Sequence, residues 1–197
     1  GHSVARAMSE AAETRESIME ATFEALAKHG YAGLTIQTIA DEFEKSKSLL
    51  YYHYDTKEDL LADFLRWMTD GFVAEVEPIA DGDVEARLDT TLDLLLPRDL
   101  DTEGRAIRTA LLELRMQAPH HEAYADRFAA LDAQLESTLE ATLRRGVEEG
   151  VYDVEPARGA RLLTATANGE LLRVVTGETD ADDARAVLDA LLERFRT

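Results

Sequence analysis

The feature that most constrains the fold is the spacing of the apolar residues, which recur at steps of three and four along nearly the whole chain. No stretch shows a sustained alternation with a period of two, so the pattern indicates helices and not strands. Pro and Gly residues and good N-caps such as Thr35 divide this pattern into separate segments. The sequence therefore predicts an all-α fold of about nine helices.

The caps and breakers also predict where the helices lie. We expect them at about residues 13–29, 35–43, 46–54, 57–76, 84–96, 102–117, 122–149, 156–176 and 180–196. Residues 1–9 resemble an expression tag, which we expect to be disordered. We expect a three-helix domain over residues 10–56, with a helix-turn-helix motif at 35–54, and a helical bundle over residues 57–197.

The net charge of -19 argues at first against binding to nucleic acid, because phosphates attract Lys and Arg and repel carboxylates. The distribution of charge changes this interpretation. All four lysines fall between Lys28 and Lys57, and residues 30–57 carry three Lys against four carboxylates. Residues 30–57 are thus nearly neutral, and the excess negative charge lies elsewhere in the chain. The excess of Asp and Glu elsewhere is typical of halophilic proteins, whose acidic surfaces stay hydrated in concentrated salt.

Several classes of protein are disfavoured by what the sequence lacks. There is no Cys, which suits a reducing cytoplasm, and no apolar run approaches the roughly 18 residues of a membrane span. His120 and His121 are adjacent and diverge by about 100° on a helix, so they do not converge on a metal ion. No phosphate-binding loop and no nucleophile paired with a base occurs. We expect a cytoplasmic protein that is not an enzyme and has no cofactor or metal.

The most informative segment runs from Leu34 to Tyr54 and reads as two short helices joined by a tight turn. The second helix of such a motif can lie in a DNA major groove, which is about 12 Å wide. Leu50 and Tyr54 supply the buried stripe of this helix. The outward face then holds hydrogen-bond donors and aromatic rings and no carboxylates. Its residues are Lys47, Ser48, Tyr51 and Tyr52.

These residues resemble the signature of the TetR family, in which Thr-x-x-x-Ile-Ala is followed by a turn, Ser-x-x-x-Leu-Tyr-x-His-Phe and Lys-x-x-Leu. The matching positions are Thr35, Ile39, Ala40, Ser46, Leu50, Tyr51, His53, Tyr54, Lys57 and Leu60. One position departs from the pattern, since Glu44 stands where the family usually has Gly in the turn. A left-handed backbone there would cost a non-Gly residue about 1 kcal/mol, so the turn would be remodelled.

The resemblance implies two groups of DNA contacts. The residues expected to face the groove are Lys47, Ser48, Leu49 and Tyr52, and those expected at phosphates are Thr35, Ser46, Tyr51, His53 and Lys57. Other roles remain open for some of them. Thr35 and Ser46 could serve only as helix caps, Tyr51 partly as a core residue, and His53 only as a surface residue.

The resemblance also implies a ligand pocket within residues 57–149 and a homodimer formed by the last two helices. The pocket residues we expect are Trp67, Met68, Phe72, Met116, Tyr124 and Phe128, although such side chains are also common in ordinary cores. The implied function is a sequence-specific regulator, a repressor that binds a palindromic operator in double-stranded DNA and is released by an apolar small-molecule effector. The alternative is a ligand-binding protein of the same fold that does not bind DNA.

Overall fold

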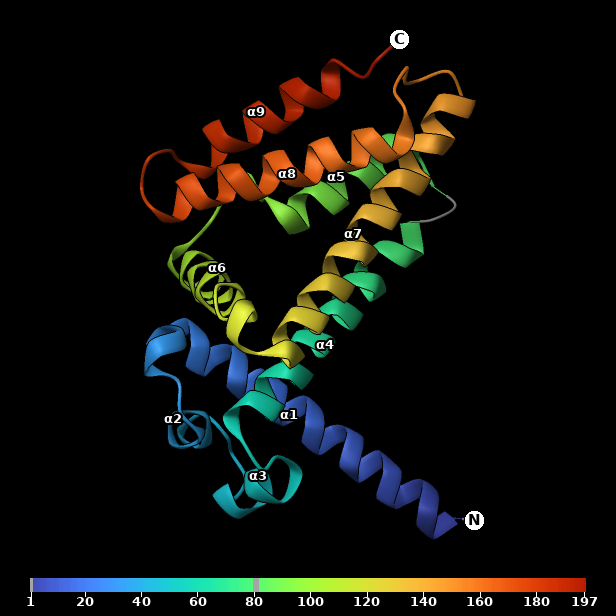
Figure 1. The fold of residues 1–197 in the computed structure, drawn as a ribbon. Helices are drawn as coiled ribbons and strands as arrows, with labels where there is room; N and C mark the ends of the chain where they lie inside the picture. Colours follow the sequence, from blue (N-terminus) through green and yellow to red (C-terminus); the bar gives the residue numbers. More distant parts are fainter. Residues whose placement is uncertain (1, 80–81) are drawn as a thin grey trace. The chain divides into compact units, whose positions relative to one another are not determined.

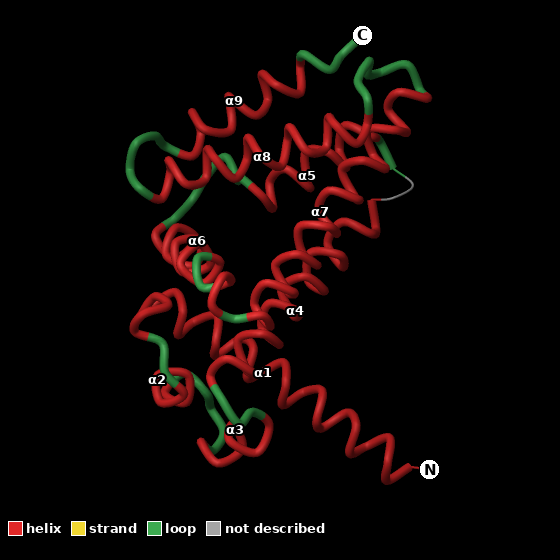
Figure 2. The backbone as a smooth tube through the Cα atoms, viewed as in Figure 1, coloured by secondary structure: helices red, strands yellow, loops and turns green. Residues whose placement is uncertain are grey.

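The computed structural model describes residues 2–79 and 82–197, and within these ranges every regular element is a helix (Figures 1 and 2). The α-helices are α1 (His2–Gly33), α2 (Ile36–Asp41), α3 (Lys47–His53), α4 (Lys57–Val76), α5 (Val84–Leu95), α6 (Thr102–Arg115), α7 (Glu122–Glu148), α8 (Pro156–Val175) and α9 (Ala181–Glu193). Two short 3-10 helices, η1 (Glu77–Ile79) and η2 (Ala118–His120), follow α4 and α6. The expected all-α fold is confirmed.

The largest difference from the expected boundaries lies at the start of α1. We expected disorder over residues 1–9 and a helix from residue 13, whereas the helix begins at His2 and its residues 3–13 are exposed. No helix breaker occurs in this segment, and Arg6 pairs with Glu10 one turn later at 3.1 Å. At the other end, Gly30 has φ 68° and ψ 178°, so it kinks the chain where we expected the helix to stop.

The first compact unit comprises residues 2–67 and 102–127. In it α1 packs against α6 and α2, and α2 packs against α3. The buried stripe of α6 is Ile107, Ala110 and Leu114. Because α6 packs on α1, this unit extends beyond the boundary at residue 56 that we expected for the helix-turn-helix domain.

The second compact unit comprises residues 68–79, 82–101 and 128–197. Its helices α8 and α9 lie side by side (Figure 1), and α5 packs against α8. The core includes Leu88, Leu143, Leu163 and Leu188. Arg185 is fully buried in this unit, where it pairs with three aspartates and donates to a main-chain oxygen: Asp89, Asp93, Asp189 and Leu96 O.

Candidate nucleic-acid interface

The helix-turn-helix has the exposed face that the sequence predicts, and of the two residues expected in the buried stripe of α3, Leu50 is buried and Tyr54 is partly buried. Ile39, Phe43 and Leu50 are buried, and α2 packs against α3 across the turn. The outward side chains of α3 are exposed: Lys47, Ser48, Tyr51 and Tyr52, the last with 83% of its surface accessible. The outer face of α3 therefore presents one cation, one hydroxyl and two phenol rings.

The turn between these helices accommodates Glu44 without strain. No described residue other than glycine has a positive φ, so Glu44 does not adopt the left-handed conformation. The remodelling that we considered from the sequence is thus a turn over residues 42–46 that does not need glycine. The penalty of about 1 kcal/mol for a left-handed residue does not apply here.

The two caps of the motif differ. Thr35 Oγ1 accepts a hydrogen bond from Thr38 N at 3.1 Å, and Thr38 Oγ1 accepts one from Thr35 N at 2.9 Å, which forms a reciprocal capping box on α2. Ser46 makes no side-chain cap to α3, and its hydroxyl instead lies 3.0 Å from that of Ser48. Thr35 is therefore a cap in addition to any contact with DNA, whereas the hydroxyl of Ser46 is exposed beside the outward face of α3.

A partly buried hydrogen-bond network fixes the end of α3. The Tyr54 hydroxyl donates to Asp63 of α4, and Arg15 of α1 donates to the same carboxylate from Nε at 3.0 Å and Nη2 at 2.9 Å. Burial and the hydrogen bond to Asp63 raise the pKa of Tyr54 well above its usual range. Burial alone would raise the pKa of Asp63, but the bonds from Arg15 and Tyr54 lower it below its ordinary value of 3.8. The network ties α3 to two longer helices, and no pattern in the sequence pointed to Arg15 or Asp63.

The four lysines differ in whether their hydrogen-bond partner is charged or neutral. Lys28 pairs with Glu42 at 2.6 Å, and this hydrogen bond is the main cause that lowers the pKa of the carboxyl. Lys45 Nζ lies 3.5 Å from Thr14 Oγ1, and the other two lysines also contact neutral groups. In the described part of the chain, three of the four lysines thus have hydrogen bonds only to uncharged partners.

Lys47 and Lys57 are held in different ways. Lys47 donates to the side-chain oxygen of Gln37 on α2 and lies 5.7 Å from the ring centroid of Tyr51. Lys57 donates to Leu34 O at 3.0 Å and lies 4.7 Å from the ring centroid of Tyr31, so it also braces the loop before α2. Gln37 is a polar exposed residue beside α3 that the sequence analysis did not select. Leu49 and His53, which it did select, are partly buried.

The expected pocket residues lie in varied surroundings. Phe72 and Phe128 are buried, Met68 is partly buried, and Met116 is at the surface with 65% exposure. Trp67 stacks on Phe64 and donates to Glu16 at 2.8 Å. Trp67, Met116 and Tyr124 belong to the first unit, and Met68, Phe72 and Phe128 to the second. Tyr124 is fully buried, and burial is the main cause that raises the pKa of its phenol.

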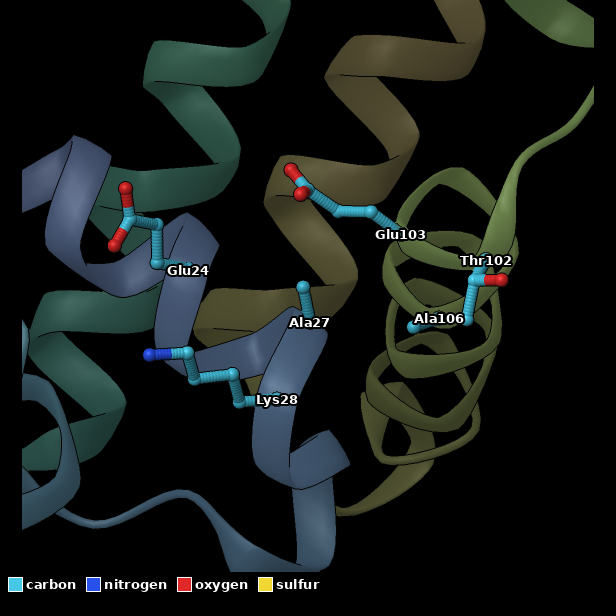
Figure 3. Close-up of a pocket in the computed structure, with 6 residues that line it drawn as sticks. All are labelled: Glu24, Ala27, Lys28, Thr102, Glu103 and Ala106. Atoms are coloured by element: carbon cyan, nitrogen blue, oxygen red, sulfur yellow. The ribbon is translucent and has the colours of Figure 1, made fainter.

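A surface depression of about 500 Å³ lies between α1 and α6 of the first unit (Figure 3). Its lining residues are Glu24, Ala27, Lys28, Thr102, Glu103 and Ala106. The side chains of Glu24 and Lys28 point away from Glu103, and Lys28 is already paired with Glu42. These polar groups do not converge on one point, so the depression carries no recognisable chemistry. Within residues 2–79 and 82–197, no group of metal-ligating side chains is assembled, and no helix is long and apolar enough to cross a membrane.

Comparisons with known proteins agree with this geometry. Residues 18–64 match the model for bacterial regulatory proteins of the tetR family, and residues 84–197 match the C-terminal model of BetI-type transcriptional repressors. An HTH-type transcriptional repressor from Streptomyces coelicolor is 34% identical over 181 residues, which cover 85% of this chain and 86% of that protein.

Solved structures add two further relatives. The crystal structure of a TetR transcription regulator from Haloarcula marismortui is 39% identical, with a TM-score of 0.83 over 94% of this chain and 100% of that chain. A transcriptional regulator from Saccharomonospora viridis, solved in complex with choline, is 26% identical, with a TM-score of 0.77 over 92% of this chain and 96% of that chain.

Proposed function

We propose that this chain, which belongs to the TetR family of transcriptional regulators, is a repressor. It binds a palindromic DNA operator as a homodimer and is released by a small molecule. The family consists of regulators and not enzymes. Repression is supported by the relative from Streptomyces coelicolor and by the match to BetI-type repressors. DNA is its partner, so we place its action in the cytoplasm.

The observation that carries the proposal is the outer face of α3. It is exposed, its side chains are donors and rings, and α3 contains no carboxylate, in a chain with 40 Asp and Glu. Such a face can donate to base edges and pack on thymine methyl groups. We assign groove contacts to Lys47, Ser48, Leu49 and Tyr52.

The phosphate contacts are proposed for the residues around the motif: Thr35, Ser46, Tyr51, His53 and Lys57. Lys57 bonds to a main-chain oxygen and so holds a fixed position beside the loop before α2. A phosphate contact from a fixed cation adds affinity without sequence information. Lys47 and Lys57 are therefore expected to differ in what they contribute.

The homodimer is proposed to form through α8 and α9. Exposed apolar side chains lie on both helices, Leu162 and Leu172 on α8 and Val187 on α9, and the exposed residues between the two leucines include Ala165 and Gly169. Small residues let a second helix approach closely, and a twofold contact uses the same surface on both subunits. The two helix-turn-helix motifs of the dimer would then bind half-sites about 34 Å, or a multiple of this, apart.

The effector is proposed to be a small molecule with an apolar body. The relative solved with choline supports a small-molecule ligand, and the buried Phe72 and Phe128 offer apolar contacts in the second unit. The ligand must favour one spacing of the two helix-turn-helix motifs over another, since a ligand with equal affinity for both states does not shift the equilibrium between them. The pocket residues assigned from the sequence, Trp67, Met68, Met116 and Tyr124 with these two, stay a prediction.

The experiment that tests DNA binding is fluorescence anisotropy with duplexes from the chain's own upstream intergenic DNA, in roughly molar KCl, against a scrambled duplex. Lys47→Ala and Tyr52→Ala should each weaken specific binding by about 1–3 kcal/mol and reduce the preference over scrambled DNA. Lys57→Ala should weaken binding to both duplexes alike. Arg144→Ala, on the exposed surface of α7, is the matched control and should change neither.

Two results would contradict the proposal. If the folded dimer prefers no genomic fragment, the alternative of a ligand-binding protein without DNA binding is favoured. If Lys47→Ala lowers binding to specific and scrambled DNA equally, Lys47 is not a groove contact.

The acidic surface is proposed to be an adaptation to concentrated salt. With 40 acidic against 21 basic residues, repulsion between carboxylates is strong in dilute buffer and screened in molar KCl. The melting temperature should therefore rise with KCl. A melting temperature that is the same in dilute and molar salt would count against this adaptation.

A further inference from the structure

A polar stripe lies along the core of the second unit, between α5 and α7. Thr91, Thr138 and Thr142 are buried there, and Arg87 is half-buried. Arg87 Nε donates to Thr142 Oγ1 at 3.0 Å, which holds the guanidinium against α7. Nη1 of the same group is buried and has no hydrogen-bond partner. A cationic donor is thus held in the core with one nitrogen unsatisfied.

The surrounding threonines donate elsewhere. The Thr142 hydroxyl donates to Thr138 O and the Thr91 hydroxyl to Arg87 O, each at 2.8 Å. Other arginines of this unit are paired with carboxylates, for example Arg98 with Asp189 and Arg173 with Glu170. A buried guanidinium nitrogen without an acceptor is unfavourable by a few kcal/mol. The structure thus leaves Arg87 in need of an acceptor, preferably an anionic one.

A second unsatisfied donor belongs to a residue that packs on α7 one helical turn beyond Thr142. The Tyr152 hydroxyl is buried without a partner. Its ring lies against Gly146, which follows Thr142 on α7 by four residues. Val84, which precedes Arg87 on α5 by three residues, lies against the same glycine. Two unsatisfied donors beside α7, one on α5 and one in the loop after α7, indicate a binding region for an acceptor better than either does alone.

An apolar cluster lies at the other end of the stripe. Phe72, Val76 and Leu135 are buried together, and Leu131 packs against them. Leu135 precedes Thr138 by three residues, so both lie on one face of α7. A ligand with an acidic head at Arg87 would have apolar side chains available for its tail.

We propose that Arg87 binds the carboxylate of a small organic acid with an apolar tail, with Nη1 donating to the carboxylate and the tail lying toward Phe72 and Leu135. This site would be the effector site of the proposed repressor, and in that respect it rests on the proposed function. A charge-assisted hydrogen bond fixes the acidic head, and the apolar area adds affinity.

Calorimetric titration of the full chain with octanoate, without DNA and at a fixed KCl concentration, tests the site. Octanoate should bind wild-type protein, and Arg87→Met should weaken it at least about tenfold, because a charge-assisted bond is lost. Arg87→Lys should retain part of the affinity. Arg144→Met, which removes an exposed arginine of α7, is the matched control and should bind octanoate like the wild type. 1-Octanol should show no dependence on Arg87, and acetate should bind more weakly than octanoate.

Any of three results would contradict the proposed site. Octanoate could bind wild type and Arg87→Met with equal affinity, acetate could bind as tightly as octanoate, or octanoate could fail to bind folded wild-type protein. If Arg87→Met does not fold, Arg87→Lys and the comparison of octanoate with 1-octanol on the wild type decide. Octanoate that binds through Arg87 but leaves DNA binding unchanged supports the site and contradicts only the release step of the proposed function.

Discussion

Replacing Gly146 by Ala should destabilise the second unit, although alanine is the better helix former. A Cβ on Gly146 would lie 2.4 Å from Cδ2 and 2.9 Å from Cε2 of Tyr152, and 3.2 Å from Cγ1 of Val84. Real Cβ atoms do not approach ring carbons so closely, so the ring or the helix must move. Tyr152 is only 2% exposed, so its ring has little room to move.

The expected magnitude combines two opposing effects. Ala in place of Gly within a helix is worth about 1 kcal/mol, whereas overpacking a buried contact costs about 1–3 kcal/mol. With a backbone-mounted Cβ against a buried ring, we take the upper part of that range and expect a net loss of about 1–2 kcal/mol. Gly71 of α4 is the matched control, because a Cβ there meets no atom within 4 Å. Gly71→Ala should therefore stabilise by up to about 1 kcal/mol.

Thermal unfolding followed by circular dichroism measures both variants. For a chain of this size, 1 kcal/mol shifts the melting temperature by about 2–4 °C. Gly146→Ala should melt about 2–8 °C below the wild type and Gly71→Ala up to about 4 °C above it. A Gly146→Ala protein that is as stable as Gly71→Ala would show that Tyr152 does not pack on Gly146, and would refute the reasoning.

Three further predictions concern the network and the DNA interface. Tyr54→Phe removes a donor to a charged group, so it should lower the free energy of unfolding by about 1–2 kcal/mol in urea titrations, and an unchanged midpoint would contradict this. The lowered pKa of Asp63 contributes stability that is present above its ordinary value of 3.8 and lost as the pH falls through the lower folded value. The free energy of unfolding of Asp63→Asn should therefore fall less between pH 5 and pH 2 than that of the wild type. The difference is the contribution of one carboxyl group that takes up a proton over this range. Log Kd for operator DNA should change with log [KCl] with a slope no steeper than about 5, because even if Lys45, Lys47 and Lys57 of each subunit all neutralised a phosphate, the dimer would neutralise about six and each contributes about 0.9; a steeper slope would place further cations at the interface.

Much of the fold could be predicted because its determinants are local. Caps and breakers such as Pro156 and Gly150 mark the ends of helices through residues that lie next to each other in the chain. The expected and observed ends of α4 and α8 therefore differ by no more than about one residue. The start of α1 could not be predicted in this way, because residues 3–13 have no buried stripe and form a helix without one.

The parts of the site that escaped prediction depend on distant residues. Arg15 and Asp63 lie 48 positions apart, and neither the helical period nor the turn chemistry relates them. The packing of α6 on α1 is of the same kind, since a buried stripe shows that a helix is covered but not by which partner. By contrast, the outward face of α3 follows from one buried residue, because Leu50 fixes the orientation of a seven-residue helix.

The carboxylates beside α3 show how an acidic chain can present a surface to DNA. Glu42 is paired with Lys28, Asp41 accepts from Gln37 at 2.8 Å, and Asp63 is held by Arg15. A paired carboxylate repels a phosphate less than a free one, because its partner's charge or dipole opposes its own field. Within residues 2–79 and 82–197, Lys47 has no carboxylate bond to break before it reaches DNA, since its partners are Gln37 and the ring of Tyr51. The acidity of the whole chain and the binding of DNA are therefore compatible, because the local arrangement of charges and not their sum acts at the distance of a contact.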